Sequence, residues 1–258
     1  MRCPAWALVA LTVTPTFFTT SAHAVDPFEV QVYEGDINDP LQAGVELHSN
    51  FTVVGRSDPA FMGEVVPDGL LRVTLEPSMG ILSWWEIGVY LQTAFQPSEP
   101  DGHFAGFKLR SKFIVPRQRT GEFILGLNIE VGRGVAALGT ADWDTEVRPI
   151  IAWLRGRWIL AVNPIIGWAL TGDRHVAPHL EPAFKVRVAA AQHVGLGVEY
   201  YADFGVLSAL PAADRQEHVM YVIGDLLNGP IELNIGVGRG LTGATDAWTI
   251  KTIIGHAF

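Results

Sequence analysis

The sequence is poor in cysteine and contains no long apolar run after its first residues. Its one cysteine, Cys3, is not preceded by the Leu-x-x-Cys pattern of a lipoprotein, so we do not expect a lipid anchor there. The rest of the chain has no thiol, which excludes a disulfide framework and a thiolate metal site. After residue 24 no stretch of 18 apolar residues occurs, so the sequence predicts no transmembrane helix.

Charge is also scarce. Charged residues make up only 17% of the chain, and the formal net charge is −9. No block or stripe of lysine and arginine is present to displace counterions from phosphates, so nucleic-acid binding is not expected. Yet 48% of the residues are hydrophobic and the mean hydropathy is +0.23. Apolar content that is high on average but never continuous fits strict alternation, in which every second side chain faces lipid and the others face a polar interior.

The first 24 residues have the features of a secretory signal peptide. Arg2 supplies the positive charge, a short apolar stretch follows, and Ala22 and Ala24 fit the small-x-small cleavage rule. A membrane-anchor helix is the alternative, but the apolar run is far shorter than the ~20 residues that span a bilayer, and Pro15 breaks it. We therefore expect cleavage after Ala24 and export. Arg2 is the only charged residue lost, so the mature net charge becomes −10, which is −9 minus 1.

From residue 44 onward, apolar and polar residues alternate in segments bounded by Gly, Pro, Asn or Asp. Within residues 84–95, large apolar side chains separate from small or polar ones: Trp85, Ile87, Val89, Leu91 and Phe95 against Glu86, Gly88, Tyr90 and Gln92. Helical spacing would mix these two sets, whereas strand spacing places them on opposite faces. The segments are therefore predicted to be strands.

Counting in this way predicts twelve strands long enough to cross a bilayer at a tilt, at residues 44–54, 69–80, 84–95, 103–114, 121–132, 142–154, 157–170, 179–189, 192–203, 215–226, 229–239 and 247–258. Short links, such as the hairpin signal Asn228-Gly229, alternate with longer ones at 55–68, 96–102, 133–141, 171–178, 205–214 and 240–246. Such alternation is typical of short periplasmic turns and long extracellular loops. The sequence therefore predicts an all-β fold, a transmembrane antiparallel up-and-down β-barrel of about twelve strands.

The C-terminal residue and the positions of the tryptophans also indicate an outer-membrane barrel. Phe258 closes an alternating strand, as in the assembly signal of outer-membrane barrels, although Thr252 and His256 stand where that signal usually has apolar residues. Seven tryptophans fall near predicted strand ends, as in an aromatic belt: Trp84, Trp85, Trp143, Trp153, Trp158, Trp168 and Trp248. We expect a Gram-negative outer membrane as the location. The expected partners are its lipid and lipopolysaccharide and, through Phe258, the barrel assembly machinery.

Residues 25–43 precede the predicted barrel of residues 44–258 and form a separate segment. Residues 28–33 alternate briefly, and residues 34–40 are rich in turn-forming types. The segment is too short to span the membrane. We expect a periplasmic segment that folds back into the lumen or caps it; a disordered lead-in is the alternative.

Several stretches resemble a group of proteobacterial outer-membrane β-barrel proteins: Pro27–Tyr33, Gly44–His48, Leu75–Ser78 with Trp84–Glu86, and Leu109–Phe113. The resemblance covers nearly the whole mature chain and implies the same barrel fold. That group has no established activity, so the resemblance implies nothing further about function.

If the apolar faces contact lipid, the opposite faces line the lumen, because a charge on the lipid face costs about 2–4 kcal/mol near the bilayer midplane. The predicted lumen-lining residues that could select solutes carry both signs: Arg72, Glu76, Glu86, Lys108, Arg110, Lys112, Glu130, Glu146, Arg148, Lys185, Arg187, Glu199 and Lys251. Further inward candidates are Glu46, His48, Asp144, Glu181, Asp203, Glu217, Asp225 and Glu232.

Two functions are compatible with such a lumen. Lys108, Arg110 and Lys112 form a basic ladder on one strand, which Lys185 and Arg187 could join only if closure brought their strand across from it. Opposite an acidic side, this ladder would filter solutes in a narrow aqueous path. Alternatively, the same charges pair across the lumen and close it, which would leave the barrel a structural role or an interaction role at the surface. A twelve-strand barrel is intermediate between filled eight-strand barrels and open sixteen-strand porins, so the sequence leaves both possibilities open.

An enzyme is the weakest alternative. A lipid hydrolase would need Ser, His and Asn together on one face, and His48–Asn50 contains these residue types. Neighbouring strand residues point to opposite faces, however, so Ser49 lies beyond the ~3 Å hydrogen-bond reach of His48. No catalytic residue is therefore predicted.

Histidines with carboxylates nearby in the sequence are candidate metal ligands. His175 and His179, near Asp173 and Glu181, have a spacing that suits a metal on a helix, but Pro178 separates them in a predicted loop. Surface histidines are expected there. The prediction is thus a passive channel or transporter for small hydrophilic solutes, with no metal and no cofactor.

Overall fold

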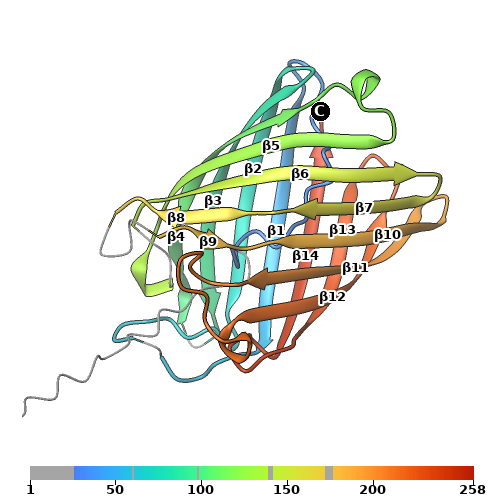
Figure 1. The fold of residues 1–258 in the computed structure, drawn as a ribbon. Helices are drawn as coiled ribbons and strands as arrows, with labels where there is room; N and C mark the ends of the chain where they lie inside the picture. The colour runs from blue at the N-terminus through green and yellow to red at the C-terminus, as the bar shows by residue number, and fades with distance from the viewer. Residues whose placement is uncertain (1–25, 60, 98, 139–141, 172–176) are drawn as a thin grey trace, which may run out of the picture.

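The chain folds into a closed antiparallel β-barrel in the computed structural model, which describes residues 26–59, 61–97, 99–138, 142–171 and 177–258 (Figure 1). The predicted signal peptide, Asp173 and His175 lie outside these residues. The strand segments are β1 (Ala43–Val54), β2 (Leu71–Leu82), β3 (Trp85–Gln96), β4 (Glu99–Ile114), β5 (Phe123–Gly134), β6 (Asp144–Arg155), β7 (Trp158–Asn163), β8 (Ile166–Ala169), β9 (His179–Leu180), β10 (Ala183–Ala191), β11 (Val194–Asp203), β12 (Glu217–Leu226), β13 (Glu232–Gly240) and β14 (Trp248–Ala257).

These segments form twelve barrel strands, as the sequence predicts. β7 and β8 both pair with β6, so they are two halves of one strand, and β9 and β10 likewise form one strand. Each was predicted to be continuous, and this is wrong. The breaks fall at Pro164 and Pro182, where proline lacks the N–H that a sheet ladder needs. The barrel closes where β1 pairs with β14, and β5 with β6.

The outer surface of the barrel is apolar and its inner surface is polar. Ile87 on β3 is 41% exposed, whereas its neighbour Glu86 is 2% exposed. The same contrast separates Leu109 from Arg110 on β4 and Leu75 from Glu76 on β2. Such an exterior is suited to lipid rather than water. No helix in the described part of the chain has the length and apolar character needed to cross a membrane.

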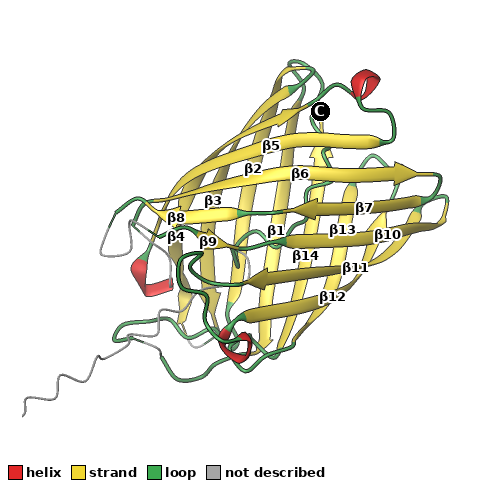
Figure 2. Cartoon of the chain, in the orientation of Figure 1, coloured by secondary structure: helices red, strands yellow, loops and turns green. Residues whose placement is uncertain are grey.

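The connections divide the barrel into two ends, which Figure 2 shows with loops in green. The turns after β2, β4, β6, β10 and β12 lie at what we call the short-turn end, together with the start of β1 and the C-terminal residue, since Phe258 donates to the carbonyl of Ala43. The loops after β1, β5, β8, β11 and β13 lie at the opposite, long-loop end. The seven tryptophans assigned to the aromatic belt lie at or near strand ends: Trp84, Trp85, Trp143, Trp153, Trp158, Trp168 and Trp248.

Two predicted connections are wrong. The long loop at 96–102 is absent, because β4 begins at Glu99 and Gln96 pairs directly with it. The pairing of β3 with β4 shifts register after Gln92 and again after Ala94. With these two shifts the strands remain paired through the turn-forming residues. The hairpin at Asn228 is longer than two residues and covers 227–231, with Asn228 in the left-handed region at φ 53°.

Residues 26–42, which we call the inner segment, run inside the barrel. Phe28 packs at the long-loop end against Leu70, Ala94, Ala105 and Leu138. At the other end, Asn38 donates through its backbone N–H to Glu86 and through its side chain to Ser78, and Pro40 forms an isolated bridge with Gly80. A position in the lumen is one of those predicted from the sequence for this segment; its assignment to the periplasm stays a prediction. The lumen is therefore occupied by chain.

Candidate functional site

The residues predicted to line the lumen face the barrel interior. All of them except the partly buried Arg187 are buried: Arg72, Glu76, Glu86, Lys108, Arg110, Lys112, Glu130, Glu146, Arg148, Lys185, Glu199 and Lys251. Their predicted role in selecting solutes stays a prediction. What the structure adds is their partners, and many of these partners belong to the inner segment.

Lys108, the first residue of the basic ladder on β4, contacts the inner segment. Its Nζ lies 2.5 Å from Oδ2 of Asp26 and 3.5 Å from Oε2 of Glu130 on the neighbouring strand β5. Asp26 also accepts from the side chain of Gln92 and from the N–H of Phe28. The ion pair therefore fixes the start of the inner segment to the wall.

Arg110 and Lys112 pair with carboxylates of the wall itself. Nη2 of Arg110 lies 2.6 Å from Glu76 and 2.9 Å from Glu86, and Nζ of Lys112 lies 3.0 Å from Glu86. The Lys112 ammonium also lies 5.1 Å from the ring centre of Tyr33, within cation–π range. Each of the three basic residues of the ladder is thus paired with at least one carboxylate.

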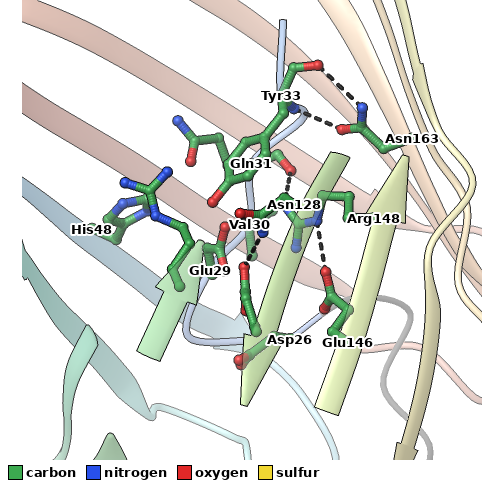
Figure 3. A network of polar contacts seen from close by, with 12 residues as sticks. Asp26, Glu29, Val30, Gln31, Tyr33, His48, Asn128, Glu146, Arg148 and Asn163 are labelled. Atoms are coloured by element: carbon green, nitrogen blue, oxygen red, sulfur yellow. Dashed lines mark hydrogen bonds and ion pairs between the residues drawn. The ribbon is translucent and has the colours of Figure 1, made fainter. Parts of the chain in front are cut away.

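Arg148 on β6 is the central contact between the wall and the inner segment (Figure 3). Its Nε donates to Glu146 at 2.7 Å, and its Nη1 lies 3.2 Å from Oε1 of Glu29 and donates to the carbonyl of Gln31 at 3.3 Å. The guanidinium carbon lies 4.5 Å from the ring centre of Tyr33. A charge buried this deeply is tolerated only when it is paired and hydrogen-bonded, and the inner segment supplies part of both.

Lys185 and Arg187 on β10 converge on the inner segment at Glu34 and do not join the ladder on β4. The distances to the two carboxylate oxygens are 2.7 Å from Lys185 and 2.6 Å from Arg187. Lys251 on β14 pairs with Glu199 and donates to the carbonyl of Val30 at 3.0 Å. Basic residues from four strands of the wall, β4, β6, β10 and β14, therefore contact one acidic segment.

Four carboxylates of the inner segment, outside the membrane-spanning strands, have shifted pKa values: burial raises those of Glu29 and Asp36, whereas those of Glu34 and Asp26 are lowered. Burial alone would raise the pKa of Glu34, but Lys185 and Arg187 outweigh burial and hold the pKa below its ordinary value of 4.5. For Asp26, burial also opposes ionisation, and Lys108 again outweighs it and lowers the pKa. Both groups are thus held as carboxylates by the wall.

Neutral hydrogen bonds complete the contact between the wall and the inner segment. Their donors and acceptors were not predicted from the sequence to be site residues. The Asn163 side chain accepts from the N–H of Tyr33 at 2.7 Å and donates to its carbonyl at 3.1 Å (Figure 3). Tyr33 and Tyr90 join their hydroxyls at 2.6 Å, and Thr74 donates to the carbonyl of Phe28. Alternation predicts that Tyr90 points inward. It does not predict which residue of the irregular inner segment Tyr90 contacts.

A polar cavity of about 480 Å³ lies between the inner segment and the wall at the short-turn end. Side chains of both signs line it, among them Glu34, Glu46, Lys112, Asp225 and Glu232. It is large enough for water or a small solute, and its lining is hydrophilic. It forms a vestibule that the inner segment closes on one side.

His48 and Ser49 on β1 lie on opposite faces. His48 is fully buried in the lumen, with Nε2 3.4 Å from Glu46 and 3.2 Å from Glu76, whereas Ser49 lies on the outer face. This arrangement gives the serine no histidine base and agrees with the prediction that these residues form no catalytic set.

Comparisons with known proteins support the fold. No family model matches the chain, and no curated protein matches its sequence. Among solved structures, the COG4313 outer membrane channel from Pseudomonas putida F1 superposes with a TM-score of 0.55 at 10% identity, over 87% of this chain and 98% of that one. The KdgM porin superposes with a TM-score of 0.55 at 7% identity, over 83% of this chain and 99% of that one. The chain therefore has the fold of outer-membrane β-barrel proteins.

Proposed function

We propose that this protein is a channel for small hydrophilic solutes in a bacterial outer membrane, and that the inner segment is its removable closure. The observation that carries the proposal is an apolar-coated barrel with a charged wall, filled by a segment that is not part of that wall. Residues 26–42 are tied to the sheet by the bridge at Pro40 and otherwise by side chains and scattered hydrogen bonds. Such contacts can be exchanged for water without breaking a strand ladder.

The distribution of charge favours a channel over a purely structural barrel. In a permanently closed barrel, the wall charges would be expected to neutralise one another. Here Lys108, Lys185 and Arg187 pair with wall carboxylates but lie closer to a carboxylate of the inner segment, and Arg148 divides its donors between wall and segment. A wall that is polar along its whole height remains compatible with water once the segment leaves.

The comparisons agree with this proposal. The superposed structures are named a channel and a porin, and one KdgM structure is in complex with disordered oligogalacturonate. A twelve-strand barrel has an interior between those of filled eight-strand barrels and open sixteen-strand porins, so a cleared lumen could pass small solutes. The proposal includes export with removal of residues 1–24, insertion through Phe258 by the assembly machinery, and lipid and lipopolysaccharide as the surroundings.

A disulfide between the inner segment and the wall tests the closure. A Cβ built on Gly35 would lie 3.5 Å from Cβ of Ile124 on β5, within the ~3.5–4.5 Å range of disulfides. Mature protein carrying Gly35→Cys and Ile124→Cys would hold this pair as its only thiols, since Cys3 is expected to be removed. The positive φ of Gly35 costs about 1–2 kcal/mol with a side chain present, which the bond must overcome.

Single-channel conductance is then recorded in planar bilayers from protein shown separately to be folded. We expect no conductance when the two cysteines form the disulfide, and conductance steps after the disulfide is reduced. A barrel lacking residues 26–37 should show conductance steps under both conditions. If the truncated, inserted barrel is silent, the channel is refuted and the closed structural barrel takes its place. If the oxidised and reduced proteins conduct equally, the channel stands but the inner segment is not its closure.

A further inference from the structure

At the long-loop end, the fold brings together His179, Glu181 and Asp203, which are separate in the sequence. One donor atom from each, an imidazole nitrogen and two carboxylate oxygens, lies within 4.8 Å of the others. Nδ1 of His179 is 3.7 Å from Oδ2 of Asp203. Two ligands of a tetrahedral zinc ion, each ~2.1 Å from the metal, are about 3.4 Å apart, so small side-chain rotations would suffice.

Backbone pairing holds these residues in place. The N–H of Phe204 donates to the carbonyl of Leu180 at 2.9 Å, and the N–H of Leu180 donates to the carbonyl of Gly205 at 3.2 Å. On the other side, the N–H of Glu181 donates to the carbonyl of Ile165 at 2.9 Å. The cluster therefore stands on paired strands, and this preorganises a ligand site.

The independent indication of a ligand is the state of Asp203. This side chain is only 2% exposed, and its Oδ1 accepts from the N–H of Gly205, yet its Oδ2 has no hydrogen-bond partner among the described residues. This same oxygen is the one that lies 3.7 Å from Nδ1 of His179. Among those same residues, neither Asp203 nor Glu181 forms an ion pair with lysine or arginine, so two neighbouring carboxylates lack a cation. A buried acceptor without a partner is energetically costly, and a bound cation would remove that cost.

A second His–carboxylate cluster shows the contrast. Glu46, His48 and Glu76 also place their donor atoms within 4.8 Å of one another. There, however, Arg110 lies 2.6 Å from Glu76, and Gln31 donates to Glu46. That cluster already has its cation and its donors, and His48 is sealed from solvent. His179 remains partly exposed, so an ion could reach it from the long-loop end.

We infer that His179, Glu181 and Asp203 bind a divalent transition-metal ion at the long-loop mouth of the barrel. One imidazole and two carboxylates are a donor set for Zn²⁺ and its neighbours rather than for an all-oxygen Ca²⁺ site, and three protein ligands leave a coordination position for water or a solute group. The site is independent of the proposed channel activity. It joins β9, the break between β9 and β10, and the end of β11.

Titration with Co²⁺ tests the site, because tetrahedral Co²⁺ has visible absorption bands that Zn²⁺ abolishes. Tag-free mature protein is refolded in detergent, stripped with chelator and titrated. We expect one equivalent bound, displaced by Zn²⁺ but not by excess Ca²⁺, and affinity reduced about tenfold or more by His179→Gln or Glu181→Gln. These two variants keep the bond from Gly205 to Asp203, so the fold is retained; heat-modifiable migration on a gel checks this.

His193→Gln is the matched control, since this histidine lies in the turn at the short-turn end, between β10 and β11. It should bind Co²⁺ as the unaltered protein does. Absence of the bands in the unaltered, folded protein would overturn the inference. Equal affinity of His179→Gln, Glu181→Gln and His193→Gln would overturn it as well, because the bound ion would then lie elsewhere.

Discussion

Arg148 on β6 and Glu29 on the inner segment form an ion pair, with Nη1 3.2 Å from Oε1, and neither side chain is exposed to solvent. The two residues are 119 positions apart in the sequence. Arg148 also holds Glu146, so a single guanidinium balances a carboxylate of the wall and one of the segment. Removal of this one side chain would leave both carboxylates buried without their cation.

We therefore expect Arg148→Met to displace the inner segment. Breaking a buried pair by removing one partner costs about 3–5 kcal/mol, whereas hydrating the two carboxylates in an emptied lumen relieves that cost. The variant should spend a much larger fraction of time in the conducting state. Open probability in single-channel recordings is the measurement.

Arg133→Met is the control for this variant. Arg133 pairs with Asp142 at 2.9 Å, but both side chains are largely exposed, and such pairs contribute about 0–1 kcal/mol. Its open probability should equal that of the unaltered protein. A silent Arg148→Met barrel, alongside a conducting barrel without residues 26–37, would show that this pair does not hold the segment.

Acid should favour opening through Glu34. Because its pKa is lowered in the closed state, its ion pairs stabilise that state fully above the ordinary pKa of 4.5, and the stabilisation is lost as pH falls through the lowered pKa. We expect the open probability to rise below about pH 4.5. Glu34→Gln removes the stabilisation at every pH, so it should open more often at pH 7 and depend less on acid. An identical pH profile for the two proteins would contradict this role of Glu34.

The faces of the strands could be predicted from the sequence because they depend on local geometry alone. Successive side chains of a strand point to opposite faces, so Glu86 points inward and Ile87 outward independently of distant parts of the chain. The breaks at Pro164 and Pro182 were missed because alternation continues on both sides of each, and the missing proline N–H outweighs that pattern.

The occupied lumen could be anticipated only in outline. The alternation in Phe28–Tyr33 suggests a strand, but a closed barrel offers no free edge for it, so side chains hold it instead. Pairs such as Glu29 with Arg148 depend on barrel closure and on the path of an irregular segment, and neither is encoded locally. The same holds for Asp203, which reaches His179 only through the pairing beside β11.

The outer surface can be tested with two leucines of nearly equal exposure. Leu109 on β4 is 56% exposed and Leu210, in the loop after β11, is 55% exposed. If the strands contact lipid, Leu109→Arg should reduce the free energy of folding into vesicles by about 2–4 kcal/mol, while Leu210→Arg should change it little. Equilibrium unfolding in vesicles measures both. Equal, small effects would show that Leu109 faces water.

Ion selectivity should reveal what the basic ladder does once the inner segment is gone. In a barrel lacking residues 26–37, Lys108 loses Asp26 and keeps only the more distant Glu130, so its charge is less fully balanced, beside Arg110 and Lys112 on the same face of β4. Replacing all three by alanine removes three positive charges from a confined path, where screening is weak, so the cation-to-anion permeability ratio should rise severalfold.

Reversal potentials in a salt gradient measure this ratio. Arg117→Ala with Arg119→Ala, in the exposed 3₁₀ turn η1 (Arg117–Arg119) of the short-turn end, removes charge of the same sign outside the lumen and should leave the ratio nearly unchanged. If both sets of substitutions shift the reversal potential equally, the ladder acts only through the net charge of the barrel. A filter formed by β4 requires that the ladder alone shifts it.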